Sequence, residues 1–258
     1  MLIDAGADVN ASDMHDYTPL ILATMDWRPG DSLDVIRMLL DAGADVDAMN
    51  GDGQTALHFC IDEENEQLVA LLIERGADVN VSDIEDTTPL HWATESGSVE
   101  CARMLLDAGA DVDARTDNGR TALRLSIQER NEPLVALLIE RGADVNASSI
   151  DRITPLHCAI KNGLVECVRM LLDAGADLHA VADGGQSVLH FYERSEQLVA
   201  LLIERGADVN ARNIEGTTPL HRAADQGRTN AVKRLLSVGS NALDCENTTK
   251  EMPLHRAC

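Results

Sequence analysis

Aromatic residues, positive charge and long apolar runs are all scarce in this chain of 258 residues. Aromatic side chains make up 2% of it, so a core has to be built from Leu, Ile, Val and Ala. Lys and Arg number 21 against 44 Asp and Glu, which gives a formal net charge of -23. Nucleic acid and anionic membranes need neutralising Lys and Arg, so neither is expected as a principal partner. No stretch approaches the roughly 20 apolar residues that cross a bilayer.

Motifs for catalysis and secretion are also missing. The sequence has no GxSxG, HExxH, P-loop or GxGxxG motif, so we expect no enzyme activity, no cofactor and no small-molecule substrate. The six cysteines are irregularly placed, without CxxC or a disulfide-like spacing. The amino terminus lacks the basic and apolar segments of a secretory signal. These features favour a reducing compartment, the cytoplasm or, as the alternative, the nucleus.

What the chain does contain is a pair of repeated phrases. Gly-Ala-Asp recurs every 33 or 31 residues after one gap of 37, with copies that begin at Gly6, Gly43, Gly76, Gly109, Gly142, Gly175 and Gly206. A phrase of the type Thr-Pro-Leu-His keeps the same period, with copies that begin at Thr18, Thr55, Thr88, Thr121, Thr154, Ser187 and Thr218. A fixed period of this length is typical of a stacked repeat array and not of a globular domain.

The segment 83–115 shows how one repeat is expected to fold. Thr88 can cap a first helix with its hydroxyl, and Pro89 suits the first helical position because its missing N–H costs nothing there. Gly97 permits the left-handed end of that helix, and Ser98 is placed to cap a second one. Helices this short are marginal alone in water. We therefore expect burial against neighbouring repeats to stabilise them.

The two phrases, Thr-Pro-Leu-His on the first helix and Gly-Ala-Asp-Val-Asn after the second, resemble the ankyrin repeat family over essentially the whole chain. The resemblance implies an all-α ankyrin-repeat solenoid of stacked helix-turn-helix pairs, with projecting β-hairpin or turn fingers. It also implies binding of other proteins without catalysis.

The register of the phrases predicts a single array over residues 1–258. It comprises a partial repeat at 1–12, seven full repeats at 13–49, 50–82, 83–115, 116–148, 149–181, 182–212 and 213–246, and a partial repeat at 247–258. Both ends fall inside a repeat, so we expect a part of a longer array. Two kinds of second helix alternate, one with Arg-Met-Leu-Leu-Asp and one with Leu-Leu-Ile-Glu-Arg, which indicates duplication of repeats in pairs.

Two repeats depart from the pattern. The first full repeat carries four extra residues around Trp27, between its two helices. This insertion is either a tolerated loop or a contact loop, because an exposed Trp is a common binding anchor. The repeat 182–212 is two residues short around Tyr192, which predicts a clipped first helix.

The fingers carry the sharpest hypothesis about binding. Every second finger has an apolar residue at its second position, beside an acidic one in three cases. Exposed apolar residues on a projecting hairpin usually serve a function. Our hypothesis is that they bind a basic or amphipathic peptide of a protein partner. The alternatives are that they pack on neighbouring fingers or are merely copied by duplication. With two nearby aromatics, the candidate contact residues are Met14, Tyr17, Trp27, Ile84, Glu85, Ile150, Asp151, Ile214 and Glu215.

The histidines and cysteines have structural interpretations. In ankyrin repeats the imidazole of the Thr-Pro-Leu-His phrase bonds locally and links the helix start to the finger. Its copies here lie in different repeats, and none has a second His, Cys or carboxylate at a spacing that would place two metal ligands on one helix face. No metal site is therefore expected. These copies are His58, His91, His157, His190, His221 and His255. Cys101 and Cys167 share a position with Leu and Val and are expected in the core.

The asparagine that closes Gly-Ala-Asp-Val-Asn has two interpretations. In some ankyrin proteins this Asn is hydroxylated by an iron-dependent oxygenase, and Asn10, Asn80, Asn146 and Asn210 match the position. The alternative is an ordinary turn-forming Asn, which needs no enzyme.

Together these features predict a non-catalytic scaffold or adaptor that binds a partner protein through its finger tips and the concave face of the first helices. One alternative is the targeting or substrate-recruiting part of a larger protein whose enzyme or effector domain lies outside this chain. Another is a duplicated array without a dedicated ligand.

Overall fold

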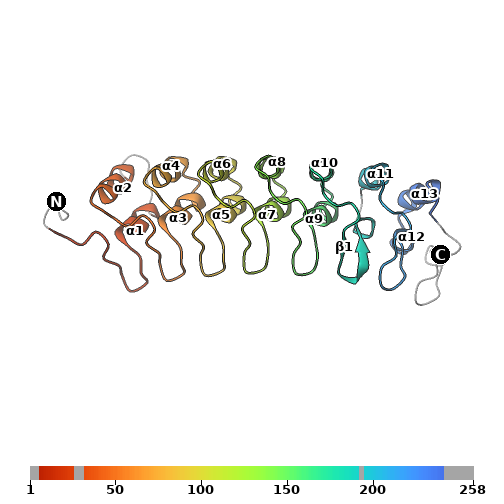
Figure 1. The fold of residues 1–258 in the computed structure, drawn as a ribbon, viewed down its shortest axis with the longest axis horizontal. Helices are drawn as coiled ribbons and strands as arrows, with labels where there is room; N and C mark the ends of the chain where they lie inside the picture. Colours follow the sequence, from red (N-terminus) through yellow and green to blue (C-terminus); the bar gives the residue numbers. More distant parts are fainter. Residues whose placement is uncertain (1–5, 26–31, 192–194, 241–258) are drawn as a thin grey trace. The chain divides into compact units, whose positions relative to one another are not determined.

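The computed structural model describes residues 6–25, 32–191 and 195–240. Contacts between Cα atoms divide the chain into two compact units, Met1–Ala143 and Asp144–Cys258. Each unit is built from pairs of short helices joined by projecting turns (Figure 1). The predicted Trp27 loop, the shortened stretch at 192–194 and the carboxy-terminal partial repeat lie outside the described residues.

In the first unit the helices are α1 (Pro19–Met25), α2 (Ser32–Asp41), α3 (Ala56–Asp62), α4 (Glu66–Glu74), α5 (Pro89–Glu95), α6 (Val99–Asp107), α7 (Ala122–Gln128) and α8 (Glu132–Glu140). The first helices α1, α3, α5 and α7 pack against one another in one row, and α4, α6 and α8 do so in another (Figure 1). The turns project from the row of first helices. We call the first five residues of each repeat its finger.

In the second unit the elements are α9 (Pro155–Lys161), α10 (Val165–Asp173), β1 (Val181–Ala182), η1 (Asp183–Gly185), β2 (Gln186–Ser187), η2 (Val188–His190), α11 (Glu196–Glu204), α12 (Pro219–Asp225) and α13 (Thr229–Ser237). Strands β1 and β2 pair antiparallel, Val181 with Ser187 and Ala182 with Gln186. Among the described residues this is the one finger with strand pairing; the others are turns. The all-α prediction is thus confirmed, with turn fingers as the general case.

The helices begin where the capping residues predict. Thr88 has extended backbone angles and precedes α5, with Pro89 at the first helical position. Ser98 caps α6, because its hydroxyl accepts the Cys101 N–H at 3.3 Å. Between the two helices, Gly97 has a φ of 80°, a left-handed conformation that glycine adopts without steric cost. Local sequence therefore sets the helix boundaries.

Packing between the rows supplies the stability that single helices lack. Leu90 on α5 and Leu105 on α6 are 1% and 0% exposed. Burial of each such side chain contributes about 1.5–3 kcal/mol, whereas helices of seven or nine residues are marginal in isolation. Leucine, isoleucine, valine and alanine make up most of the core, as the scarcity of aromatics requires.

The repeat 182–212 departs from the others in its first helix. Where other repeats have an α-helix of seven residues, this one has the three-residue 3₁₀ helix η2, Val188–His190. The prediction of a clipped first helix is confirmed.

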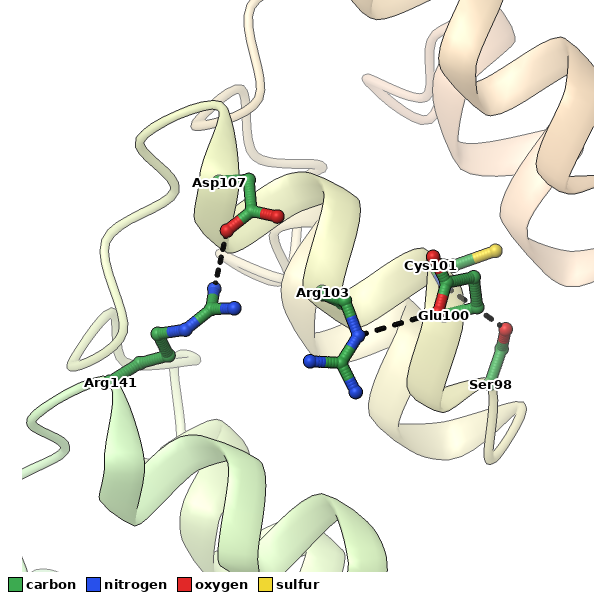
Figure 2. Close-up of polar contacts among 6 residues, drawn as sticks. All are labelled: Ser98, Glu100, Cys101, Arg103, Asp107 and Arg141. Carbon is green, nitrogen blue, oxygen red and sulfur yellow. Dashed lines mark hydrogen bonds and ion pairs between the residues drawn. The ribbon is translucent and has the colours of Figure 1, made fainter.

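Ion pairs join successive second helices on their outer side. Arg141, at the end of α8, lies 2.8 Å from Asp107, at the end of α6 (Figure 2). Equivalent pairs join Arg75 to Asp41 and Arg205 to Asp173, each at 2.9 Å. In each pair the Asp ends a second helix of the Arg-Met-Leu-Leu-Asp kind, and the Arg lies at the end of one of the Leu-Leu-Ile-Glu-Arg kind. The alternation of the two kinds of helix along the chain therefore places opposite charges side by side. Because the partners are partly exposed, each pair contributes only about 0–1 kcal/mol.

Candidate binding surface

In four fingers the Asp or Asn side chain at the first position organises the turn. In the finger at 83–87, one carboxylate oxygen of Asp83 accepts the N–H groups of Glu85 and Thr87, both at 2.9 Å. Asn213 does the same for Glu215 and Thr217, at 3.0 and 2.8 Å. The short polar side chain thus accepts the backbone N–H groups of the turn, which have no carbonyl of the described backbone as a partner there, and stabilises the turn.

Neighbouring fingers are joined by backbone hydrogen bonds. In the first unit, Ile84 N–H donates to the Asp52 carbonyl at 3.1 Å, and Asp117 N–H donates to the Glu85 carbonyl at 3.0 Å. In the second, Ile214 N–H donates to the Gly184 carbonyl at 2.9 Å. Sequence analysis missed these bonds, because they involve backbone atoms of residues about one repeat apart and leave no side-chain pattern. They align the fingers within a unit and fix where each second position lies.

The predicted apolar residues at the second finger position are highly exposed. Met14 is 89% exposed and Ile84 71% in the first unit, and Ile150 is 81% and Ile214 78% in the second. These values exclude the alternative that they pack on neighbouring fingers. The adjacent acidic residues Glu85, Asp151 and Glu215 are also exposed. An apolar side chain beside a carboxylate is therefore available to solvent at several finger tips.

The aromatic candidates differ in their availability. Tyr17 is half-buried, with its ring 6.3 Å from that of Phe59. Trp27 lies outside the described residues. Trp92 is half-buried, and its Nε1–H donates to Asp83 at 3.4 Å.

A cavity of about 260 Å³ lies between the fingers and α5 in the first unit. Its lining includes Asp83, Ile84, Glu85, Trp92, Glu95 and Asp117. Burial raises the pKa of the Glu95 carboxyl, and nearby Glu129, Asp83 and Glu85 raise it further while Arg120 lowers it. Sequence analysis did not single out Glu95, although its spacing of three from Trp92 puts both on one helix face.

The described histidines of the Thr-Pro-Leu-His phrase bond locally to the residue that precedes their helix, as predicted. Nδ1 of His91 accepts the Thr88 N–H at 3.1 Å, so the ring proton is on Nε2, which donates to the carbonyls of Ala114 and Arg120 at 3.1 and 3.2 Å. The imidazole thus links its own helix start to the next finger. Burial lowers the pKa of His58 and of His157 to about 4, and it also lowers the pKa of His91 and of His190.

In the described part of the chain, potential metal ligands are dispersed and the cysteines are buried. No group of three or more His, Cys, Asp and Glu in it could hold a metal ion. Cys60, Cys101, Cys158 and Cys167 are buried, and burial raises the pKa of Cys60 and of Cys101, which keeps their thiols protonated. Nor does it contain a helix long and apolar enough to span a bilayer.

The closing asparagines link successive repeats. Nδ2 of Asn80 donates to the Gly109 carbonyl at 3.2 Å, and its Oδ1 accepts the Asp111 N–H at 2.7 Å. Asn146 makes the same two bonds, to Gly175 and Asp177, at 3.3 and 2.7 Å. The structure thus gives these side chains a role beyond the local turn. Hydroxylation of Asn80, Asn146 and Asn210 stays a prediction.

Two larger cavities, of about 470 and 590 Å³, lie between α11 and α13 in the second unit. Most residues that line each cavity are polar; Glu196 and Asn230 line both, and Arg228 and Thr229 line the first. Small-molecule sites are lined predominantly by apolar and aromatic side chains, so these cavities lack the character of such a site.

Comparison with known proteins places the chain among repeat proteins. A family model described as ankyrin repeats (3 copies) matches residues 28–116, 82–149, 112–182 and 188–258. The chain is 37% identical over 76 residues to the Neurogenic locus Notch protein of Drosophila melanogaster. The aligned segment covers 29% of this chain and 3% of that protein. It is 48% identical over 44 residues to a putative ankyrin repeat protein of Pyrobaculum aerophilum, 17% of each chain. The chain thus spans only a small part of either relative.

A solved structure is similar over most of its length. The crystal structure of the ankyrin repeat domain of Bcl-3, a member of the IkappaB protein family, aligns with a TM-score of 0.74 and 33% sequence identity. The alignment covers 86% of this chain and 98% of that one.

Proposed function

Because this chain belongs to the ankyrin repeat family, we propose that it is a scaffold or adaptor that binds a partner protein through its finger tips and the faces of its first helices. The ankyrin repeat fold is a non-enzymatic interaction fold, and it generally mediates contacts between proteins. The face that makes those contacts here is that of the fingers and the first helices.

The exposed apolar residue at the finger tips is the observation that carries this proposal. Ile84, Ile150 and Ile214 are 71–81% exposed, and each precedes an exposed carboxylate. Single exposed apolar side chains are common, whereas these three recur at one finger position of alternate repeats. Duplication of repeats in pairs also produces such recurrence, so the variants below test the contact itself. Finger turns held by hydrogen bonds lose little freedom on binding, which favours affinity. A basic or amphipathic partner segment would match these tips.

The setting of this interaction is also part of the proposal. The irregular cysteines and the buried thiols support a reducing location, the cytoplasm or the nucleus. The match to 3% of the Notch protein supports a second candidate, in which the repeats recruit a partner for an enzyme or effector domain outside this chain.

A pull-down from cell extract with mass spectrometry tests the proposed face. The finger variant carries Ile84→Ser, Ile150→Ser and Ile214→Ser. A control of equal polarity change carries Val35→Ser, Met38→Ser and Leu236→Ser, at residues of α2 and α13 that are 40–47% exposed. Circular dichroism checks that both variants keep their helices.

We expect a set of proteins that the native chain and the control retain and that the finger variant loses. Equal retention by both variants, or equal loss from both, would contradict the proposal.

A further inference from the structure

One half-buried aromatic ring in the first unit, that of Trp92, lines an acidic cavity and is held by two contacts. The ring of Trp92 meets that of His58 edge to face, with centroids 5.5 Å apart and an interplanar angle of 73°. Its Nε1–H donates to Asp83, whose other oxygen is fixed by two finger N–H groups. The indole is therefore positioned before any ligand arrives.

Trp92 is the one tryptophan at its position of the repeat. The residue after the His of the Thr-Pro-Leu-His phrase is Phe59 in the preceding repeat and Leu125 in the following one. In the second unit Cys158, Phe191 and Arg222 occupy the position. Duplication thus does not account for Trp92, and the cavity beside it is lined by residues of three successive repeats.

Carboxylates dominate the cavity. Five line it, from Asp52, Asp83, Glu85, Glu95 and Asp117, against the single guanidinium of Arg120. Glu85 and Glu95 are exposed, and neither side chain forms a hydrogen bond or an ion pair with any described residue. The mutual repulsion of these groups would be relieved by a cation placed among them.

The size of the cavity favours a side chain over a small molecule as its occupant. Its volume of about 260 Å³ is below the roughly 300–1,000 Å³ of small-molecule sites. A planar guanidinium stacks on an aromatic face and pairs with carboxylates, and both groups are present here.

We propose that this cavity, the Trp92 pocket, holds one arginine side chain of the partner protein, stacked on the indole and paired with Glu85 and Glu95. Ile84, which also lines the cavity, contacts an apolar residue beside that arginine. The inference rests on the proposed function, since it specifies the segment that the finger face accepts.

Titration followed by NMR tests the pocket in the full chain. The probe is acetyl-Gly-Leu-Gly-Arg-Gly-Leu-Gly-amide, compared with the same peptide carrying the uncharged isostere citrulline. The chain has two tryptophans, so a Trp27→Phe variant identifies the Nε1–H signal of Trp92. We expect the arginine peptide to shift this signal and the amides of Glu85 and Glu95 with a dissociation constant of about 1 mM. The citrulline peptide should leave them unchanged.

A matched pair of variants checks that the pocket carboxylates are responsible. Glu85→Gln with Glu95→Gln should weaken binding about three- to tenfold. Glu74→Gln with Glu140→Gln, on exposed second-helix positions, removes the same charge and should change binding less than about twofold.

Three results would overturn the inference: no shift with the arginine peptide, equal shifts with citrulline, or equal weakening by both variant pairs. Its failure is distinct from failure of the proposed function. If partners lost from the finger variant all remain bound to the Glu85→Gln, Glu95→Gln chain, the finger face stands as the binding surface and the Trp92 pocket does not.

Discussion

The residue that most clearly joins one repeat to the next is the closing asparagine. Asn80 uses both halves of its amide on the loop of the following repeat, donating to Gly109 and accepting from Asp111. At the equivalent position of the preceding repeat, Asp47 accepts the Asp78 N–H at 2.8 Å. An oxygenase that modifies Asn80 would first have to open this contact. Sequence identified the position but not the bonds, because a turn-forming Asn and a linking Asn look alike.

Two substitutions at Asn80 separate its two hydrogen bonds. Asn80→Ala removes both and should lower the free energy of unfolding by about 1–2 kcal/mol. Asn80→Asp keeps the acceptor and should cost less than half of that. Urea unfolding followed by circular dichroism measures both variants. Equal losses in the two variants would show that the bond accepted from the Asp111 N–H contributes nothing.

Among the elements, the helices could be predicted far better than the contacts between fingers. Thr88, Pro89, Gly97 and Ser98 define helix boundaries by local chemistry, and the structure places the ends of α5 and α6 accordingly. The alignment of fingers depends on backbone atoms about one repeat apart. The Trp92 pocket likewise depends on side chains from three repeats, which no local pattern reveals.

Two glycines at the fourth finger position separate backbone strain from crowding. Gly53 and Gly119 both have positive φ, 76° and 67°. A Cβ on Gly119 would meet nothing within 4 Å, whereas one on Gly53 would lie 3.2 Å from backbone atoms of Asp83 and Ile84. Gly119→Ala should therefore cost about 1–2 kcal/mol from the left-handed conformation alone. Gly53→Ala should cost more, because the neighbouring finger must also move.

Thermal or urea unfolding of the two alanine variants decides this ordering. A Gly53→Ala variant as stable as Gly119→Ala would mean that the fingers are not held in register by their backbone bonds.

For the whole molecule, charge and buried histidines act in opposite directions as the pH falls. The net charge of -23 repels itself, and protonation of carboxylates below about pH 5 relieves that repulsion. The buried imidazoles have the opposite effect on stability as the pH falls. The ordinary pKa of 6.5 applies to the unfolded chain, whereas folding lowers the pKa of His58 and of His157 to about 4. Between these values the unfolded state binds more protons, so stability is full above pH 6.5 and is lost as the pH falls toward 4.

The chain should accordingly lose stability when the pH is lowered from about 7 to about 5, by at most about 1.36 kcal/mol per pH unit for each such histidine. The urea midpoint measures the loss, and the NMR signals of the imidazole rings identify its source. His58 and His157 should remain neutral to about pH 5. A ring that titrates near its ordinary pKa of 6.5 would disprove the assignment.

The central claim is that partners contact the finger side of the repeats, and site-specific photo-crosslinking tests it most directly. A benzophenone amino acid is placed at position 84 or 214, on a finger, or at position 38 or 236, on a second helix. After irradiation in cell extract, the attached proteins are identified by mass spectrometry. We expect the same proteins to be attached from both finger positions and not from the second helices. Attachment from positions 38 and 236 alone would contradict the account.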